Sequence, residues 1–125
     1  MTLTHTETQA VDLAVLATYD DAQIEGEPDF VVELLDIYLN EVPRLFDSIR
    51  KAITNNEGIT AKRAAHSLRG SSGNLGVLQM ATIAGELEHL ENNSGASATE
   101  LLMSLENEFE RVKEILNAER QRRSP

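Results

Sequence analysis

Apolar residues recur at three- and four-residue steps through the middle of the first half of the chain. Such spacing places them on one face of an α-helix. The pattern predicts an amphipathic helix over about 28–53, with Pro28 at its first position and a bend at Pro43, because proline lacks the amide hydrogen that the helix interior uses. The apolar positions are Val31, Leu34, Leu35, Tyr38, Val42, Leu45, Phe46, Ile49 and Ile53.

Similar series predict four further helices, separated by glycine- and asparagine-containing breaks. They are a brief helix over 11–21, a helix over 57–74 with Gly76 as C-cap, a helix from Leu78 to the sequence "NNSG", and a last helix from a capping box of Ser97 and Glu100 to Leu116.

Nothing in the sequence alternates as a strand would, and no internal repeat is present. Four substantial helices with short connections predict an all-α fold, an antiparallel four-helix bundle with a short additional N-terminal helix. The predicted organisation is a flexible tail over 1–10, one bundle domain over 11–118 and a basic C-terminal tail over 119–125.

Composition and charge exclude several classes of protein. A chain of 125 residues with a net charge of −10 repels phosphate backbones, so we expect no nucleic-acid binding. The absence of cysteine excludes disulfides and thiolate metal sites and fits an intracellular, cytoplasmic protein. No apolar run has the length of a membrane span, and the N-terminal residues lack the pattern of a signal peptide.

The sequence "AAHSLRGSSGNLG" over 64–76 places a histidine inside a predicted helix together with residues that disfavour a purely structural role. On a helical wheel, His66 shares its face with Lys62, Arg63, Arg69, Gly70 and Gly73. The opposite face carries the core stripe of Ala61, Ala64, Leu68, Ser71 and Leu75. His66 is therefore predicted to be exposed.

The face around His66 is cationic and sterically open. No Asp or Glu occurs between Gly58 and Gly85, although the chain contains 21 acidic residues. Lys62, Arg63 and Arg69 favour a bound negative charge such as a phosphoryl group or an acidic partner surface, although a solvated basic face would look the same. Glycine is unfavourable inside helices, so Gly70 and Gly73 suggest that another protein must approach His66 closely.

An exposed neutral imidazole is a nucleophile that can accept a phosphoryl group covalently. The chain has no nucleotide-binding loop and no acidic cluster for Mg²⁺. We therefore expect a phosphoryl carrier that has no cofactor of its own, no resident metal and no kinase machinery, and that receives its phosphoryl group from another protein.

The 64–76 segment resembles the motif of histidine-containing phosphotransfer (Hpt) domains. The matching residues are His66, Leu68, Arg69, Gly70, Ser71, Ser72, Leu75 and Gly76, and a weaker resemblance extends from about 12 to 116. The resemblance implies a four-helix bundle in which His66 accepts a phosphoryl group. It also implies docking of response-regulator receiver domains, which supply the aspartate and Mg²⁺, in a relay that begins at a sensor histidine kinase.

The sequence leaves three alternatives to a phosphotransfer protein. The first is a helical-bundle interaction module without phosphorylation. The second is a metal-binding bundle based on the Glu86-x-x-His89 pair, which lacks the second such pair that these sites need. The third is the phosphoacceptor domain of a chemotaxis-type kinase or a piece of a hybrid kinase. The sequence does not give the distance of Glu86 and Glu88 from the predicted phosphate site.

Overall fold

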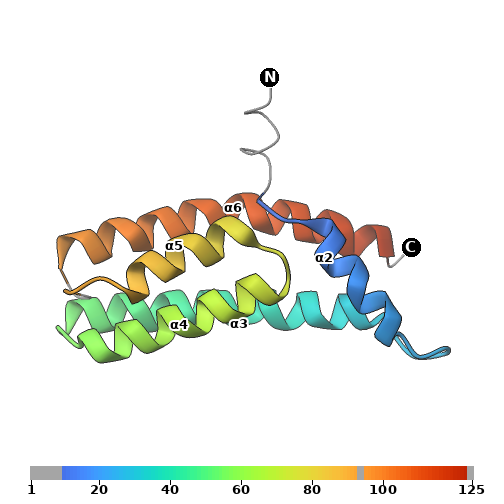
Figure 1. Cartoon of the computed structure of the whole chain (residues 1–125), viewed down its shortest axis with the longest axis horizontal. Coiled ribbons are helices and arrows are strands. Elements are labelled where there is room, and N and C mark those ends of the chain that lie inside the picture. Colours follow the sequence, from blue (N-terminus) through green and yellow to red (C-terminus); the bar gives the residue numbers. More distant parts are fainter. Residues whose placement is uncertain (1–9, 93–94, 124–125) are drawn as a thin grey trace, which may run out of the picture.

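The structure, a computed structural model, describes residues 10–92 and 95–123, and all regular structure in these residues is helical. The elements are α2 (Leu13–Thr18), the 3₁₀ helix η1 (Tyr19–Ala22), α3 (Phe30–Thr54), α4 (Gly58–Asn74), α5 (Leu78–Glu88) and α6 (Ala96–Arg123). Helices α3 to α6 lie side by side as an antiparallel bundle, and α2 lies at one end of it (Figure 1). The predicted fold class is confirmed.

The first bundle helix begins two residues later than predicted. Asp29 is the N-cap of α3, and its carboxylate accepts hydrogen bonds from the amides of Val31 (2.8 Å) and Val32 (3.2 Å). The capping carboxylate places the start at Phe30, so Pro28 precedes the helix. The helix continues through Pro43 to Thr54 without interruption.

A tight turn joins α4 to α5 and also receives the N-terminal segment. Gly76 has a φ of +76°, and a Cβ there would lie 2.7 Å from the backbone oxygen of Asp12. The amide of Asp12 donates a 2.7 Å hydrogen bond to the carbonyl of Gly76. Glycine is therefore required both by the left-handed backbone and by the close approach of another segment.

The last helix is longer at both ends than the sequence pattern indicates. It begins at Ala96, so Ser97 lies inside its first turn and the predicted capping box is wrong. It ends at Arg123, so residues 119–123 are part of the bundle and not a separate tail. The predicted flexible tail over 1–10 lies outside the described residues except for Ala10, which is buried.

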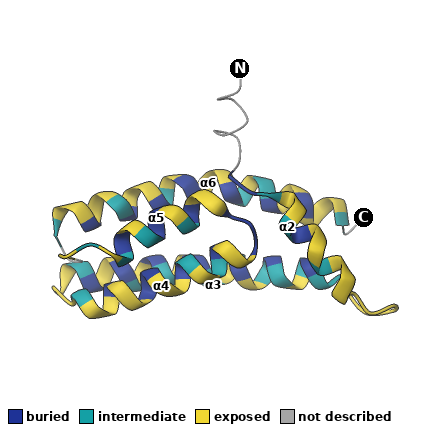
Figure 2. Ribbon diagram, in the orientation of Figure 1, coloured by how far each residue is buried: buried dark blue, intermediate teal, exposed yellow. Residues whose placement is uncertain are grey.

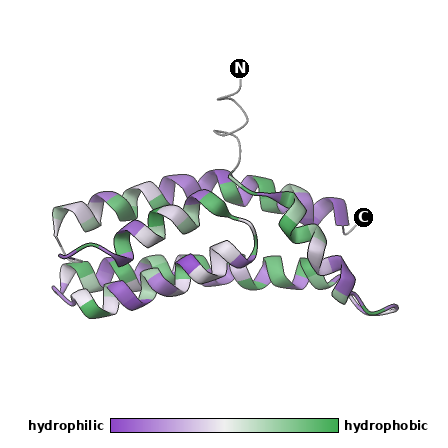
Figure 3. Cartoon of the chain, in the orientation of Figure 1, coloured by the Kyte–Doolittle hydropathy of each residue, from purple (hydrophilic) through white to green (hydrophobic). Residues whose placement is uncertain are grey.

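The core is a single cluster of aliphatic side chains with a few aromatic rings, and buried residues line the facing sides of the helices (Figure 2). Hydrophobic and hydrophilic residues also alternate along each helix, as expected for helices with one face in the core (Figure 3). One buried polar pair crosses the core, because the Tyr38 hydroxyl on α3 lies 2.7 Å from Oγ of Ser72 on α4. Ser71, which the helical wheel predicts on the core stripe, is only half-buried, and Ser72 is the fully buried serine. None of the described helices is long and apolar enough to cross a membrane.

Candidate functional site

His66 lies in the middle of α4 with its imidazole directed away from the core. Its side chain is 64% exposed, whereas Ala61, Ala64 and Ala65 on the other face of the same helix are buried. These small side chains allow α5 to lie close to α4, and the two helices are neighbours in the bundle (Figure 1). The predicted exposure of His66 agrees with this arrangement.

Glu88, at the last position of α5, holds the ring of His66 from the neighbouring helix. Oε2 of Glu88 lies 2.7 Å from Nδ1 of His66, and the carboxylate is only 13% exposed. Burial acts to raise the pKa of Glu88, but the hydrogen bond with His66 and the charge of Arg69 outweigh it and lower the pKa below its usual value. The carboxylate is therefore ionised at neutral pH and can only accept a hydrogen bond, which favours the neutral tautomer that carries its hydrogen on Nδ1 and leaves the lone pair of Nε2 free.

Arg69 contacts both His66 and Glu88. Its Nε lies 3.0 Å from Oε1 of Glu88, and its Nη2 lies 3.4 Å from Nδ1 of His66. The aliphatic part of the side chain passes across α5 at Gly85, where an added Cβ would lie 3.3 Å from Cδ of Arg69. Glycine at this position thus leaves room for the guanidinium to reach the imidazole.

The remaining predicted site residues line the same side of α4. Lys62 and Arg63 are exposed one turn before His66 and form no ion pair with any residue that the structure describes. Gly70 and Gly73 are exposed, and a Cβ at either position would meet nothing within 4 Å. A partner that reaches His66 therefore meets two free cations on one side and open space on the other.

A shallow groove of about 140 Å³ runs between α3 and α4 beside the two glycines. Leu34 and Ile37 contribute its apolar wall on α3, and Ile37 is 63% exposed. Ser71 and Asn74 contribute the α4 side, and the Ser71 hydroxyl donates a 2.9 Å hydrogen bond to Glu41 across the groove. The groove extends the open surface around Gly70 and Gly73 toward α3.

The metal-binding alternative was based on Glu86 and His89. Within residues 10–92 and 95–123, no three His, Asp or Glu side chains come together as metal ligands would. Nδ1 of His89 lies 2.7 Å from the carbonyl oxygen of Gly85 and so caps its own helix.

Comparison with known proteins places this arrangement in a family. The family model of the Hpt domain matches residues 33–115, which include the motif around His66 and all of α4 and α5. The chain belongs to the Hpt domain family. Its function is histidine phosphotransfer in a phosphorelay, in which Hpt domains work with receiver domains and kinases. This finding confirms the resemblance seen in the sequence and does not favour the interaction module without phosphorylation.

A solved structure supports the same assignment over nearly the whole chain. This Hpt domain is similar to the histidine-containing phosphotransfer protein B (HptB) of Pseudomonas aeruginosa PAO1, with 27% identity and a TM-score of 0.81. The match covers 90% of this chain and 96% of the other. Among curated protein sequences, none matches this chain significantly.

The sequence-based site residues of this Hpt domain thus lie together on α4, but one neighbour was missed. Glu88 was noted in the sequence without a role, because its distance from His66 depends on how α5 lies against α4. Glu86, two residues earlier, is exposed and faces elsewhere. The only available sequence signal was that Glu86 and Glu88 are the first acidic residues after a long stretch without any.

Proposed function

We propose that His66 is the phosphoacceptor of this Hpt domain and that Nε2 is the reacting atom. The observation that carries the proposal is the 2.7 Å contact between Nδ1 of His66 and the largely buried carboxylate of Glu88. With its proton held on Nδ1, the ring presents an unprotonated nitrogen on the exposed face of α4. His5 lies outside the described residues, and His89 is engaged with its own helix.

In the proposed reaction, the lone pair of Nε2 forms a bond to phosphorus as the bond between phosphorus and the receiver's aspartate oxygen breaks. The aspartate leaves as a carboxylate, and the imidazole acquires a positive charge while it keeps the proton on Nδ1. Glu88 stabilises that charge as it develops, and Arg69 lies close enough to neutralise the incoming phosphoryl oxygens. Transfer to a second receiver reverses these steps.

Receiver domains are the proposed donors and acceptors, with a sensor histidine kinase at the start of the relay. We propose that a receiver docks over Gly70 and Gly73 and against the groove at Ile37, where the surface is open and partly apolar. Lys62 and Arg63 would attract the acidic surroundings of its phosphorylated aspartate. We also propose that the receiver brings the Mg²⁺ that the transfer uses.

The test is transfer from a panel of receiver domains phosphorylated with radioactive acetyl phosphate. We expect the wild-type chain to acquire acid-labile, base-stable label, as phosphohistidine does, and the folded His66→Gln variant to acquire none. Because His66 is exposed, the variant should keep the wild-type melting temperature. Label that persists in the variant, or that maps to His5 or His89, would overturn the assignment.

A further inference from the structure

The negative charge of this chain is strongly segregated along the sequence. Residues 1–43 contain ten of the 21 acidic residues and none of the 11 lysines and arginines. From Arg44 onward the chain carries eleven charges of each sign. The entire net charge of −10 therefore arises from the N-terminal third, which in the described residues forms α2, η1, the loop to α3 and the first half of α3.

Part of this charge is neutralised within the fold. Arg123 on α6 lies 2.9 Å from Asp20 and 3.4 Å from Asp29, and Arg120 lies 2.6 Å from Asp36. Four exposed carboxylates of the same region form no ion pair with any described residue. These are Asp21, Glu25, Glu27 and Glu33.

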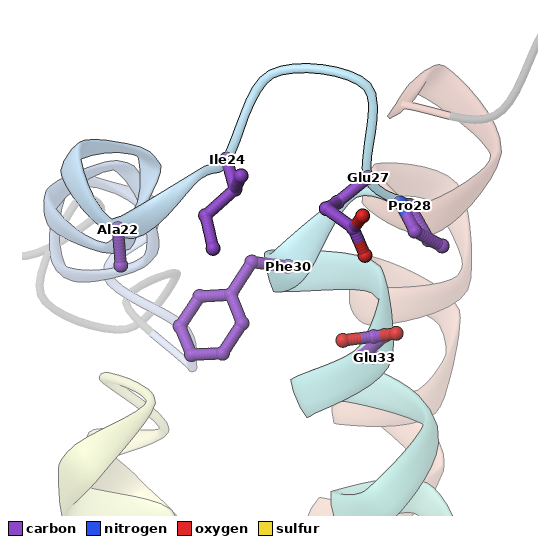
Figure 4. Close-up of a pocket in the computed structure, with 6 residues that line it drawn as sticks. All are labelled: Ala22, Ile24, Glu27, Pro28, Phe30 and Glu33. Atoms are coloured by element: carbon purple, nitrogen blue, oxygen red, sulfur yellow. The ribbon is translucent and has the colours of Figure 1, made fainter.

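Two of the unpaired carboxylates border an open pocket of about 110 Å³ between η1 and α3, whose lining is partly polar and partly apolar. Figure 4 shows Ala22, Ile24 and the ring of Phe30 on one side of the pocket and the carboxylates of Glu27 and Glu33 on the other, with Glu27 in the loop before α3 and Glu33 on α3. Ile24 is 66% exposed although it is a large hydrophobic residue. With the exposed Ala22 and Pro28 it forms a small apolar patch, and an apolar patch with a polar rim is a typical feature of a binding surface.

The loop that forms this pocket is ordered by its own hydrogen bonds. Nε2 of Gln23 lies within 3.1 Å of the carbonyl oxygens of Ile24, Glu27 and Pro28, and its Oε1 accepts a 2.7 Å hydrogen bond from the amide of Phe30. The amide of Glu27 bonds to the carbonyl of Ile24 across a turn in which Gly26 has a φ of +86°. A loop fixed in this way loses little conformational freedom when a partner binds.

We propose that this acidic pocket binds a basic, partly apolar segment of another protein. A lysine stem would lie against Ile24 and Phe30, and its ammonium group would lie between Glu27 and Glu33. The pocket is open to solvent, and its volume of about 110 Å³ leaves room for part of the aliphatic stem of a lysine. The pocket shares no residue with the surface around His66, so a partner bound here leaves the phosphotransfer site accessible.

The probe for this proposal is an acetylated, amidated heptapeptide of sequence KLKAKLK, titrated into the full ¹⁵N-labelled chain at low salt. We expect amide shift changes concentrated in residues 22–33. Ile24→Ser and the double variant Glu27→Gln/Glu33→Gln should each weaken binding about tenfold, since each removes an apolar or ionic anchor. Glu25→Gln is the matched control, because Glu25 is an exposed acid of the same loop that does not line the pocket, and it should bind nearly as well as wild type.

A peptide with serine in place of both leucines should bind the wild-type protein no more tightly than the original peptide binds the Ile24→Ser variant. The proposal is overturned if shift changes spread over acidic residues throughout the bundle, or if all variants bind equally, since either result means general charge attraction. It is also overturned if the protein alone shows concentration-dependent shifts at the pocket, because the occupant is then a second copy. Phosphoryl acceptance should be unchanged in every pocket variant, so this test is independent of the role of His66.

Discussion

Oε2 of Glu88 lies 2.7 Å from Nδ1 of His66, although the two residues are 22 positions apart and belong to different helices. The contact joins an exposed imidazole to a largely buried, ionised carboxylate, and it favours the tautomer with the ring hydrogen on Nδ1. The proposed phosphoacceptor therefore lies on α4, whereas the carboxylate beside its Nδ1 lies on α5.

Replacing Glu88 should change the tautomer of His66 without unfolding the bundle. Glu88→Ala removes the acceptor for the Nδ1 proton, and we expect transfer to slow roughly tenfold or more. Long-range ¹H–¹⁵N spectra of the imidazole should show the proton shifting from Nδ1 toward Nε2. Glu86→Gln, on the same helix but exposed, is the control, and equal rates in the two variants would contradict the role given to Glu88.

Arg69→Ala should affect both the transfer rate and the lifetime of the phosphorylated form. The guanidinium lies 3.4 Å from the ring, and a charge-assisted hydrogen bond to phosphate contributes about 1.5–3 kcal/mol. We expect roughly tenfold slower transfer and faster loss of label in a hydrolysis assay. Arg63→Ala should instead act mainly through docking, with an effect that disappears at high salt. An unchanged transfer rate in the Arg69→Ala variant would contradict this division of roles.

Gly70→Gln separates stability from function. The position is helical and exposed, and nothing lies within 4 Å of an added Cβ. The free energy of unfolding should therefore stay the same or rise by up to about 1 kcal/mol, and the melting temperature should follow it. The longer side chain projects into the space that a docking receiver would occupy, so transfer and receiver affinity should fall. Thr60→Gln, exposed on another side of α4, should leave transfer unchanged; normal transfer by Gly70→Gln would exclude the steric argument.

The buried pair of Tyr38 and Ser72 should behave as a coupled unit. Burial raises the pKa of Tyr38, so its hydroxyl stays neutral, and one of the two hydroxyls donates a 2.7 Å hydrogen bond to the other. Tyr38→Phe leaves a buried serine hydroxyl without a partner and should cost roughly 1–2 kcal/mol in urea unfolding. Adding Ser72→Ala should cost less than the sum of the single changes. Simple additivity would show that the pair is not coupled.

The ion pairs at the C-terminal end of α6 should make the free energy of unfolding depend on pH in the acidic range. Hydrogen bonds with Arg123 and Arg122 lower the pKa values of Asp20 and Glu119, respectively, against the opposing effect of burial. Groups with lowered pKa stabilise the fold above their unfolded pKa of about 4 and lose that contribution as the pH falls further. Arg123→Gln should therefore reduce stability at pH 7 more than at pH 3, as measured by urea unfolding. An equal loss at both pH values would show that Arg123 acts through packing alone.

Local spacing in the sequence was sufficient to predict most of the helices and the exposed side of α4. A period of 3.6 residues determines which side chains share a face, so the placement of His66 opposite Ala61, Ala64 and Leu68 needed no tertiary information. The motif from His66 to Gly76 is also contiguous, and this is why the family was recognisable from the residues alone.

Helix ends were less predictable, because caps and long-range contacts set them. Asp29 starts α3 after Pro28 through its carboxylate, which the apolar pattern does not register. Arg123 contacts Asp20 and Asp29, and these acids from the start of the chain are brought to it only by the fold. A basic run that looks like a tail in the sequence is therefore the last turn of a bundle helix.

The sequence by itself determined the all-helical class, the exposed histidine and its cationic, glycine-bearing face, because each of these follows from residues within two or three turns of one another. Tertiary structure alone decided that Glu88 rather than Glu86 reaches His66, that Gly85 leaves room for Arg69, and that Asp12 lies against Gly76. The reason is the same in each case: the contact joins segments whose relative register is set by how the helices lie against each other, and no local pattern encodes that register.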